Sequence, residues 1–202
     1  MTERIRTRLT PAARRDQILD VAARVIVQEG LQAATMERLA RAAHVSKALV
    51  YTYFATRDGL LGALLQREQA DLGDRGMAAA LRAETFPDLI AQTTRHYLEH
   101  VRDRGPLIAA LLADPSTAAL MEAESRINRD QTIRYLVRAT RRAYGLPLAP
   151  AIVAVDMLMG ATGRAGSRVA DGELEIEDAV NLCVQIALGG LERLAAQARA
   201  RA

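Results

Sequence analysis

The sequence predicts an all-α fold of about nine helices, in which a small N-terminal three-helix unit precedes a larger helical bundle. Alanine and leucine dominate the 202 residues and only six are proline, a composition that favours helix. Apolar side chains recur three and four residues apart along most of the chain, and no stretch alternates as a strand does. Helix-breaking residues divide this pattern into separate elements.

The first helix is predicted to begin after Thr10 and at Pro11, because an N-cap residue followed by proline is typical of a helix start. Gly30 is expected to end it as a left-handed cap. The apolar face of this helix consists of Ile18, Val21, Ala22, Val25 and Ile26.

Two short helices are predicted to follow, the first from Thr35 and the second capped by Ser46. His44 and Val45 interrupt them. Two short helices joined by about three residues form a helix-turn-helix.

The rest of the chain is expected to remain helical. A fourth helix opens at residues 56–58 and is expected to end or kink at Gly73 and Gly76. The later helices are predicted at 85–104, at 107–113 after the Gly105-Pro106 break, at 116–144, and in two final segments on either side of residues 171–172.

Charge is unevenly distributed along the chain. Residues 1–60 contain ten basic and six acidic side chains, whereas the remaining residues contain seventeen basic and eighteen acidic ones. A basic excess confined to the first third suggests a polyanion as the partner of that segment, although a random drift in arginine content would give the same pattern. Lys47 is the only lysine among the 27 basic residues.

The lone Cys183 excludes an internal disulfide and a cysteine-based metal site. No apolar run is expected to approach the roughly 20 residues that span a bilayer, and the N-terminus has no apolar stretch behind its charges. These features predict a cytoplasmic protein with no membrane partner, and no cofactor is expected.

Residues 35–61, TMERLARAAHVSKALVYTYFATRDGLL, resemble the DNA-binding signature of the TetR family of transcriptional regulators. The matching positions are Thr35, Leu39, Ala40, Ala43, Val45, Ser46, Lys47, Val50, Tyr51, Tyr53, Phe54, Arg57, Leu60 and Leu61. The resemblance implies a helix-turn-helix DNA-binding domain with a basic arm at 1–60 and a ligand-binding and dimerisation domain at 61–202. It further implies a non-enzymatic homodimer, a repressor released from a palindromic operator by a small molecule.

The predicted third helix has two faces. Val45, Val50 and Phe54 are spaced to pack inward, whereas Lys47 and Tyr51, four residues apart, share the outward face. Lysine donates to guanine or phosphate, and tyrosine hydroxyls hold phosphates. The expected DNA-contacting residues are Thr35, Ser46, Lys47, Ala48, Leu49, Tyr51, Tyr53 and Arg57.

Thr35 and Arg57 are included because helix N-termini favour a phosphate. For the arm arginines at positions 4, 6 and 8, entry into a minor groove and simple screening of phosphates both stay open. His44 stands where the family usually has glycine, so a left-handed residue is expected at the turn. Leu49 replaces a small polar residue and contacts either a thymine methyl or its own neighbours.

Ligand-binding residues are sought in the long helix after residue 116, where apolar and polar groups share one face as they do in pockets. The candidates on this helix are Met121, Asn128, Thr132 and Tyr135, and further candidates outside it are His96, His100 and Met157. The final two helices are expected to form the dimer, because small residues permit close helix approach; packing within one subunit is the alternative. These small residues are Gly160, Gly163, Gly166, Gly189 and Gly190.

Two other functions compete with this interpretation. The segment HYLEH at 96–100 matches the H-x-x-E-H pattern of some zinc peptidases. Catalytic zinc needs a third protein ligand, and no histidine is left for it outside the helix-turn-helix, so no metal site is expected. A helical adaptor that binds only proteins is the second alternative, against which the motif at 35–61 argues.

Overall fold

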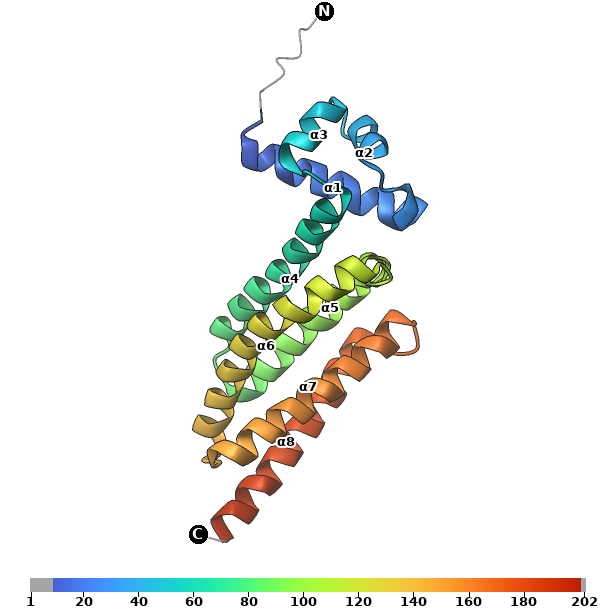
Figure 1. Cartoon of the computed structure of the whole chain (residues 1–202). Helices are drawn as coiled ribbons and strands as arrows, with labels where there is room; N and C mark the ends of the chain where they lie inside the picture. Colours follow the sequence, from blue (N-terminus) through green and yellow to red (C-terminus); the bar gives the residue numbers. More distant parts are fainter. Residues whose placement is uncertain (1–8, 201–202) are drawn as a thin grey trace, which may run out of the picture. The chain divides into compact units, whose positions relative to one another are not determined.

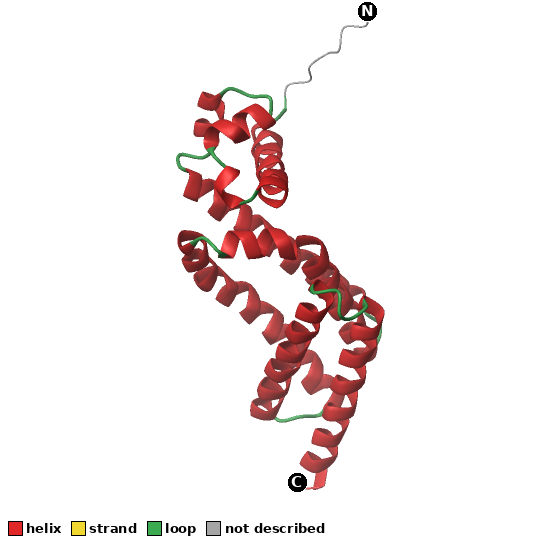
Figure 2. Ribbon diagram, turned by 90° about the vertical axis from the view of Figure 1, so that its right-hand side faces the viewer, coloured by secondary structure: helices red, strands yellow, loops and turns green. Residues whose placement is uncertain are grey.

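The computed structural model describes residues 9–200, and it describes every side chain in that range except those of 116 and 119–130. Within the described residues the chain consists of helices joined by loops (Figure 2). This confirms the all-α prediction, and the expected number of helices is close to the one observed. The elements are α1 Pro11–Glu29, the 3₁₀ helix η1 Leu31–Ala33, α2 Met36–Ala42, α3 Lys47–Tyr53, α4 Arg57–Arg82, α5 Phe86–Leu112, α6 Pro115–Tyr144, α7 Leu148–Ala170 and α8 Ile176–Ala200 (Figure 1).

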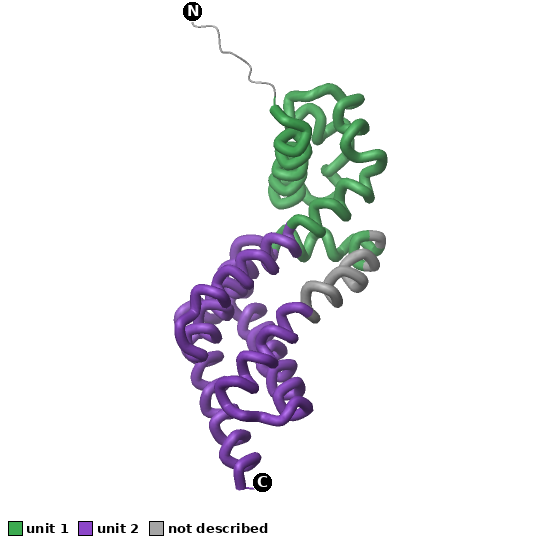
Figure 3. Tube along the Cα trace, turned by 90° about the vertical axis from the view of Figure 1, so that its left-hand side faces the viewer, with its two compact units in different colours: residues 1–67, 106–121 green, residues 68–105, 122–202 purple. Residues whose placement is uncertain are grey.

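The chain divides into two compact units, and neither is a single stretch of sequence (Figure 3). The first unit contains residues 1–67 and 106–121, and the second contains residues 68–105 and 122–202. Each of α4, α5 and α6 therefore contributes residues to both units.

One apolar core holds the first unit together. α1 supplies its predicted apolar face, and α2, α3, the start of α4 and the end of α5 close over it. The buried members are Ile18, Leu19, Val21, Ala22, Ala23, Val25, Ile26, Ala34, Met36, Leu39, Ala40, Ala43, Val50, Phe54, Leu60, Leu61, Ala63, Leu64, Leu65, Leu107 and Leu111. Burial on this scale fixes the positions of the short α2 and α3, because helices of seven residues are marginal in isolation.

The predicted end of a helix at Gly73 and Gly76 and the predicted break at Gly105 and Pro106 are wrong. α4 runs through Gly73 and Gly76 to Arg82, and α5 runs through Gly105 and Pro106 to Leu112. A proline inside a helix costs about 3 kcal/mol. Continuing the helix buries the two leucines that follow, at 107 and 111, and each contributes about 1.5–3 kcal/mol. Tertiary burial thus offsets a local preference for ending the helix.

The second unit has two apolar clusters. One lies among α6, α7 and α8 and contains buried Val137, Leu146, Ala151, Ala154, Val155, Leu191 and Ala195. The other cluster joins α5 to the end of α7 and the start of α8, and its buried members are Leu98, Val169, Ala179 and Val180. α7 and α8 lie side by side along their length (Figure 1).

The outer surfaces of α7 and α8 are apolar as well. Both helices are long and apolar enough to cross a membrane by length and composition, so the expectation that no stretch reaches that length is wrong. Only 17% and 33% of the residues in their most apolar windows are buried. The large apolar side chains left exposed on this surface are Leu148, Ile152, Val153, Met157, Leu182, Ile186 and Leu194. We call this set the α7/α8 face.

The glycines of α7 and α8 have two different environments. A Cβ on Gly166 would lie 3.0 Å from Cε1 of Tyr97, so this glycine admits a ring from α5 of the same unit. Gly163 likewise lies against the Tyr97 hydroxyl. Gly189 and Gly190 are exposed, and an added Cβ would meet nothing within 4 Å. Packing within the subunit therefore accounts for Gly163 and Gly166.

Candidate nucleic-acid interface and ligand cavity

Side-chain caps begin both helices of the helix-turn-helix. The Thr35 hydroxyl accepts a hydrogen bond from the backbone N–H of Arg38 at 3.1 Å, and the Ser46 hydroxyl accepts one from the N–H of Leu49 at 3.1 Å. Each hydroxyl satisfies a backbone donor that the first turn of a helix leaves unpaired. The predicted starts of α2 and α3 are confirmed.

The turn between α2 and α3 depends on His44. Its φ is 54°, and it is the only non-glycine residue with a positive φ among those described. This left-handed conformation lets the N–H of Val45 reach back to the carbonyl of Ala40 at 3.0 Å. The expectation of a left-handed histidine at the position usually held by glycine is confirmed.

The inward face of α3 is also as predicted. Val50 and Phe54 are buried in the core of the first unit, and Val45 packs against it. The guanidinium of Arg15 in α1 lies 5.3 Å from the centre of the Phe54 ring, which adds a cation–π contact at the end of α3.

The outward face of α3 carries Lys47, Ala48 and Tyr51, all exposed. The Tyr51 side chain is 45% exposed, although aromatic rings usually bury most of their apolar surface. Leu49 and Tyr53 are half-buried, and Tyr53 packs against the core of the unit. The tyrosine pair is thus split between solvent and core.

Arg57 has a structural environment that sequence reasoning missed. Its guanidinium donates to the carbonyl oxygens of Leu31 at 3.0 Å and Ala34 at 3.2 Å, and it reaches Oδ2 of Asp114 at 3.4 Å. It thereby connects the start of α4 to η1 and to the loop after α5. The partners lie 23 to 57 residues away in the sequence, so spacing gave no signal of them. The arginines at 4, 6 and 8 lie outside the described residues.

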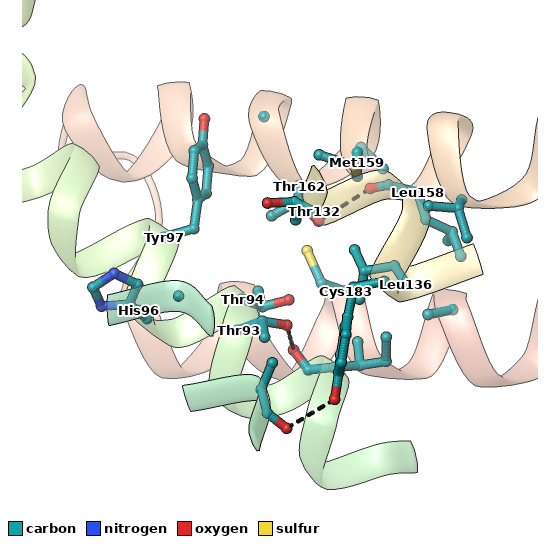
Figure 4. A pocket seen from close by; sticks show the side chains of 18 of the residues that line it. Thr93, Thr94, His96, Tyr97, Thr132, Leu136, Leu158, Met159, Thr162 and Cys183 are labelled. Carbon is teal, nitrogen blue, oxygen red and sulfur yellow. Dashed lines mark hydrogen bonds between the residues drawn. The ribbon is translucent and has the colours of Figure 1, made fainter. Parts of the chain in front are cut away.

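A cavity of about 450 Å³ lies in the second unit. Its walls come from all five helices of that unit, and most of the lining is apolar. Thr93, Thr94, Thr132, Thr162 and Cys183 lie around this common space (Figure 4). Among the described lining residues there is no aspartate, glutamate, lysine or arginine.

The polar groups of the cavity are mostly hydroxyls, and some of these already have a backbone partner. Thr93 donates to the carbonyl of Leu89 at 2.6 Å, and Thr162 donates to that of Leu158 at 3.0 Å. Each hydroxyl oxygen keeps the capacity to accept a hydrogen bond. Burial raises the pKa of the Cys183 thiol, which keeps it neutral.

Three ligand-binding candidates line the cavity, namely Thr132, Tyr135 and His96. The other candidates lie elsewhere. Met157 is 70% exposed on the α7/α8 face, and His100 is buried one turn beyond His96, outside the lining. The side chains of Met121 and Asn128 lie outside the described residues.

Sequence reasoning also missed residues that shape the cavity. Gly73 and Gly76 of α4 both line it, and a Cβ on Gly76 would lie 3.6 Å from Cδ2 of His96. Their lack of side chains leaves room for the cavity where a break in the helix was expected. The pairing of two glycines three residues apart inside a long helix was the available signal.

His96 and His100 do not build the metal site of the alternative hypothesis. In the part of the chain that is described, no group of three histidine, cysteine or acidic residues is placed to hold a metal ion. The His100 ring lies close to the carboxylate of Glu68, and Glu68 accepts two hydrogen bonds from Arg104 at 2.5 and 2.6 Å. Burial nevertheless lowers the pKa of His100, so the ring is neutral near pH 7.

Comparisons with known proteins agree with this geometry. Residues 18–64 match the family model described as "Bacterial regulatory proteins, tetR family". The HTH-type transcriptional regulator BetI of Rhizobium meliloti (strain 1021) is 33% identical over 114 residues, which cover 56% of this chain and 56% of that relative's length. The HTH-type transcriptional activator FasR of Mycolicibacterium smegmatis is 28% identical over an alignment that covers 93% of this chain and 87% of that relative's length.

A crystal structure of a TetR-like transcriptional regulator from Rhodococcus sp. RHA1 extends the likeness to the whole fold. Its TM-score is 0.71 at 25% sequence identity, and the alignment covers 91% of this chain and 98% of that one. The helix-turn-helix, the family match over residues 18–64 and this full-length likeness lead to one conclusion. Residues 18–64, which hold the helix-turn-helix, match the TetR family of transcriptional regulators, and the chain as a whole has the fold of a TetR-like regulator.

Proposed function

We propose that the chain is a ligand-responsive homodimer that represses transcription and leaves its operator when a small molecule binds. The observation that carries this proposal is the outward face of α3, where the chain's only lysine stands four residues from an exposed tyrosine. Residues 1–60 are proposed as the DNA-binding domain and residues 61–202 as the ligand-binding and dimerisation domain. Binding to operator DNA requires that the protein be located in the cytoplasm.

The DNA contacts are proposed by position on the helix-turn-helix. Lys47, Ala48 and Tyr51 would enter the major groove, with Leu49 against a base edge. The N-terminal turns that begin after Thr35 and Ser46 supply backbone donors for phosphates, and Tyr53 adds a hydroxyl at the rim. For Arg57 we propose a positioning role, because its guanidinium donors are already engaged by η1 and Asp114.

The test compares two substitutions that each remove one positive charge. Lys47→Ala is expected to weaken binding to DNA from upstream of the protein's own gene by about 1–3 kcal/mol per contact. Arg75→Ala, at a side chain 69% exposed on α4 in the second unit, should leave binding unchanged. Gel shifts at several salt concentrations would measure both, and equal affinities for the two variants would refute the assigned role of α3.

The cavity supports an uncharged, mostly apolar effector. Its described walls offer hydroxyl groups and no charged partner, and burying an unpaired charge costs several kcal/mol. A cavity of about 450 Å³ is within the usual range for small-molecule sites. A thermal-shift screen of neutral and charged compounds, with each hit retested for release of DNA, would identify the class.

The α7/α8 face supports a homodimer. It exposes seven large apolar side chains to water on two neighbouring helices, and large exposed apolar patches mark interfaces. Asp156 and Arg193 are exposed on the same helices, which favours a protein partner over lipid. Dimerisation would set two recognition helices roughly 34–36 Å apart, in successive major grooves. Sedimentation of the wild-type protein tests this directly.

Repression is the finer part of the proposal. The relative from Mycolicibacterium smegmatis is named a transcriptional activator, so the test must distinguish repression from activation. A reporter gene placed behind the bound operator decides the matter: expression should fall when the regulator is produced and recover when an effector is added. A rise on production would identify an activator.

A further inference from the structure

Part of the cavity wall is exposed on α7 and α8. Among the described residues that line the cavity, three are exposed, and these are Gly160, Ala161 and Ile186. Ile186 is 57% exposed, and a Cβ on Gly160 would meet nothing within 4 Å. The first two residues belong to α7 and the third to α8, and we call this exposed part of the cavity wall the mouth.

Exposed apolar side chains flank this mouth along both helices. On α8, Leu182 lies one turn before Ile186 and Leu194 lies two turns after it, so the three form a single stripe. On α7, Met157 lies one turn before Gly160. A partner that covers the stripe on both sides of Ile186 must also cover the mouth.

We propose that a second copy of this chain closes the cavity, so that the ligand site is complete only in the dimer. The inference rests on the proposed dimer and ligand-binding functions and adds a physical link between them. In the single chain, a bound apolar molecule would keep part of its surface in water at the mouth. Closure by the partner removes that surface from water, which strengthens binding. By linkage, the ligand tightens the dimer by the same factor.

Cys183 gives a test that needs no ligand. It is the chain's only cysteine, it lines the cavity, and it lies one turn from Ile186 at the mouth. An uncharged maleimide should therefore reach this thiol through the mouth, and a second copy should block the route. The reaction is followed at one fixed pH, because burial raises the pKa of this thiol.

Two matched substitutions separate closure from general effects. Leu194→Glu places a charge on the α7/α8 face at a side chain that is 38% exposed and does not line the cavity. Leu81→Glu makes the same change at a leucine that is 71% exposed, belongs to α4 and is not part of that face. Leu194→Glu is expected to yield a monomer whose Cys183 reacts about tenfold faster or more, while Leu81→Glu stays dimeric and reacts as the wild type does.

Dilution of the wild-type protein is a second measurement that requires no variant. The rate at Cys183 should rise as the concentration falls below the dissociation constant of the dimer measured by sedimentation. Equal rates in monomer and dimer would overturn closure while leaving the dimer itself intact. A wild-type protein that sediments only as a monomer would remove the proposed dimer, and closure with it.

The effect on ligand affinity is measured with N-phenyl-1-naphthylamine, an uncharged apolar fluorophore. The wild-type dimer should bind it about tenfold more tightly than the Leu194→Glu monomer. Equal affinities would overturn closure. Failure of the dye to bind either protein would count against the proposed apolar effector, and the rate at Cys183 would still decide closure.

Discussion

Removing the guanidinium of Arg57 should destabilise the first unit and leave the outward side chains of α3, our proposed DNA contacts, unchanged. Arg57→Met retains most of the side-chain stem and removes every donor. The carbonyl of Ala34, a fully buried residue, then loses the hydrogen bond that it accepts at 3.2 Å, and the Leu31 carbonyl loses one at 3.0 Å. The Leu31 carbonyl also accepts from the N–H of Ala34, so it stays partly satisfied.

The magnitude follows from these two bonds. A hydrogen bond from a charged donor contributes about 1.5–3 kcal/mol, and leaving one buried acceptor unpaired costs about 1–3 kcal/mol. The side chain is 27% exposed, so water replaces part of the lost interaction. We expect a loss of about 2–3 kcal/mol in the free energy of unfolding, which corresponds to a fall of roughly 4–12 °C in the midpoint of thermal unfolding for a chain of this size.

The assay is thermal and urea unfolding followed by far-ultraviolet circular dichroism. Arg41→Met is the matched control, because Arg41 lies in α2 of the same unit, is 68% exposed and pairs with Glu37 across one helical turn. Its effect should stay within about 0.5 kcal/mol. Equal midpoints for the two variants would refute the reasoning. A wild-type midpoint for Arg57→Met combined with weakened DNA binding would instead identify a phosphate contact.

Two further predictions concern histidines. His44→Gly should raise the free energy of unfolding by about 1 kcal/mol, because a left-handed φ strains residues that have a Cβ and glycine has none. His44→Ala should bring no such gain. Equal urea midpoints for the two variants would contradict this prediction. His100 has a pKa lowered from 6.5 by burial, so the unfolded chain binds a proton that the folded chain does not, and stability should fall as pH drops below that value. Between about pH 7.5 and pH 5.5 the unfolding midpoint of the wild type should fall more than that of His100→Leu, and parallel losses would rule out a contribution from His100.

Features encoded by neighbouring residues could be predicted from the sequence. The caps Thr10, Thr35 and Ser46 each accept a hydrogen bond from a residue three positions ahead, and the left-handed turn at His44 lies within the same short range. The inward set on α3 was also predictable, because helical spacing alone decides which side chains share a face. These features carry the recognition helix and hence the DNA-binding assignment.

Other features were decided by contacts between segments far apart in the sequence. α5 continues through Pro106 because Leu107 and Leu111 are buried in a core built mainly from residues 18–65. The Gly-Pro pair next to them in the sequence gives no information about that distant core. The guanidinium of Arg57 is engaged by η1 and Asp114 for the same reason.

The cavity and its mouth belong entirely to the tertiary structure. Gly73 and Gly76 line the cavity together with residues of α5, α6, α7 and α8, and their lack of side chains leaves room for it. The sequence shows that these two side chains are absent, but it does not show which helices surround the space. The sequence by itself determined which helix we propose to face DNA, since helical periodicity and capping act within a few residues. The tertiary structure decided where the cavity lies and which of its lining residues are exposed, since both depend on which distant helices pack together.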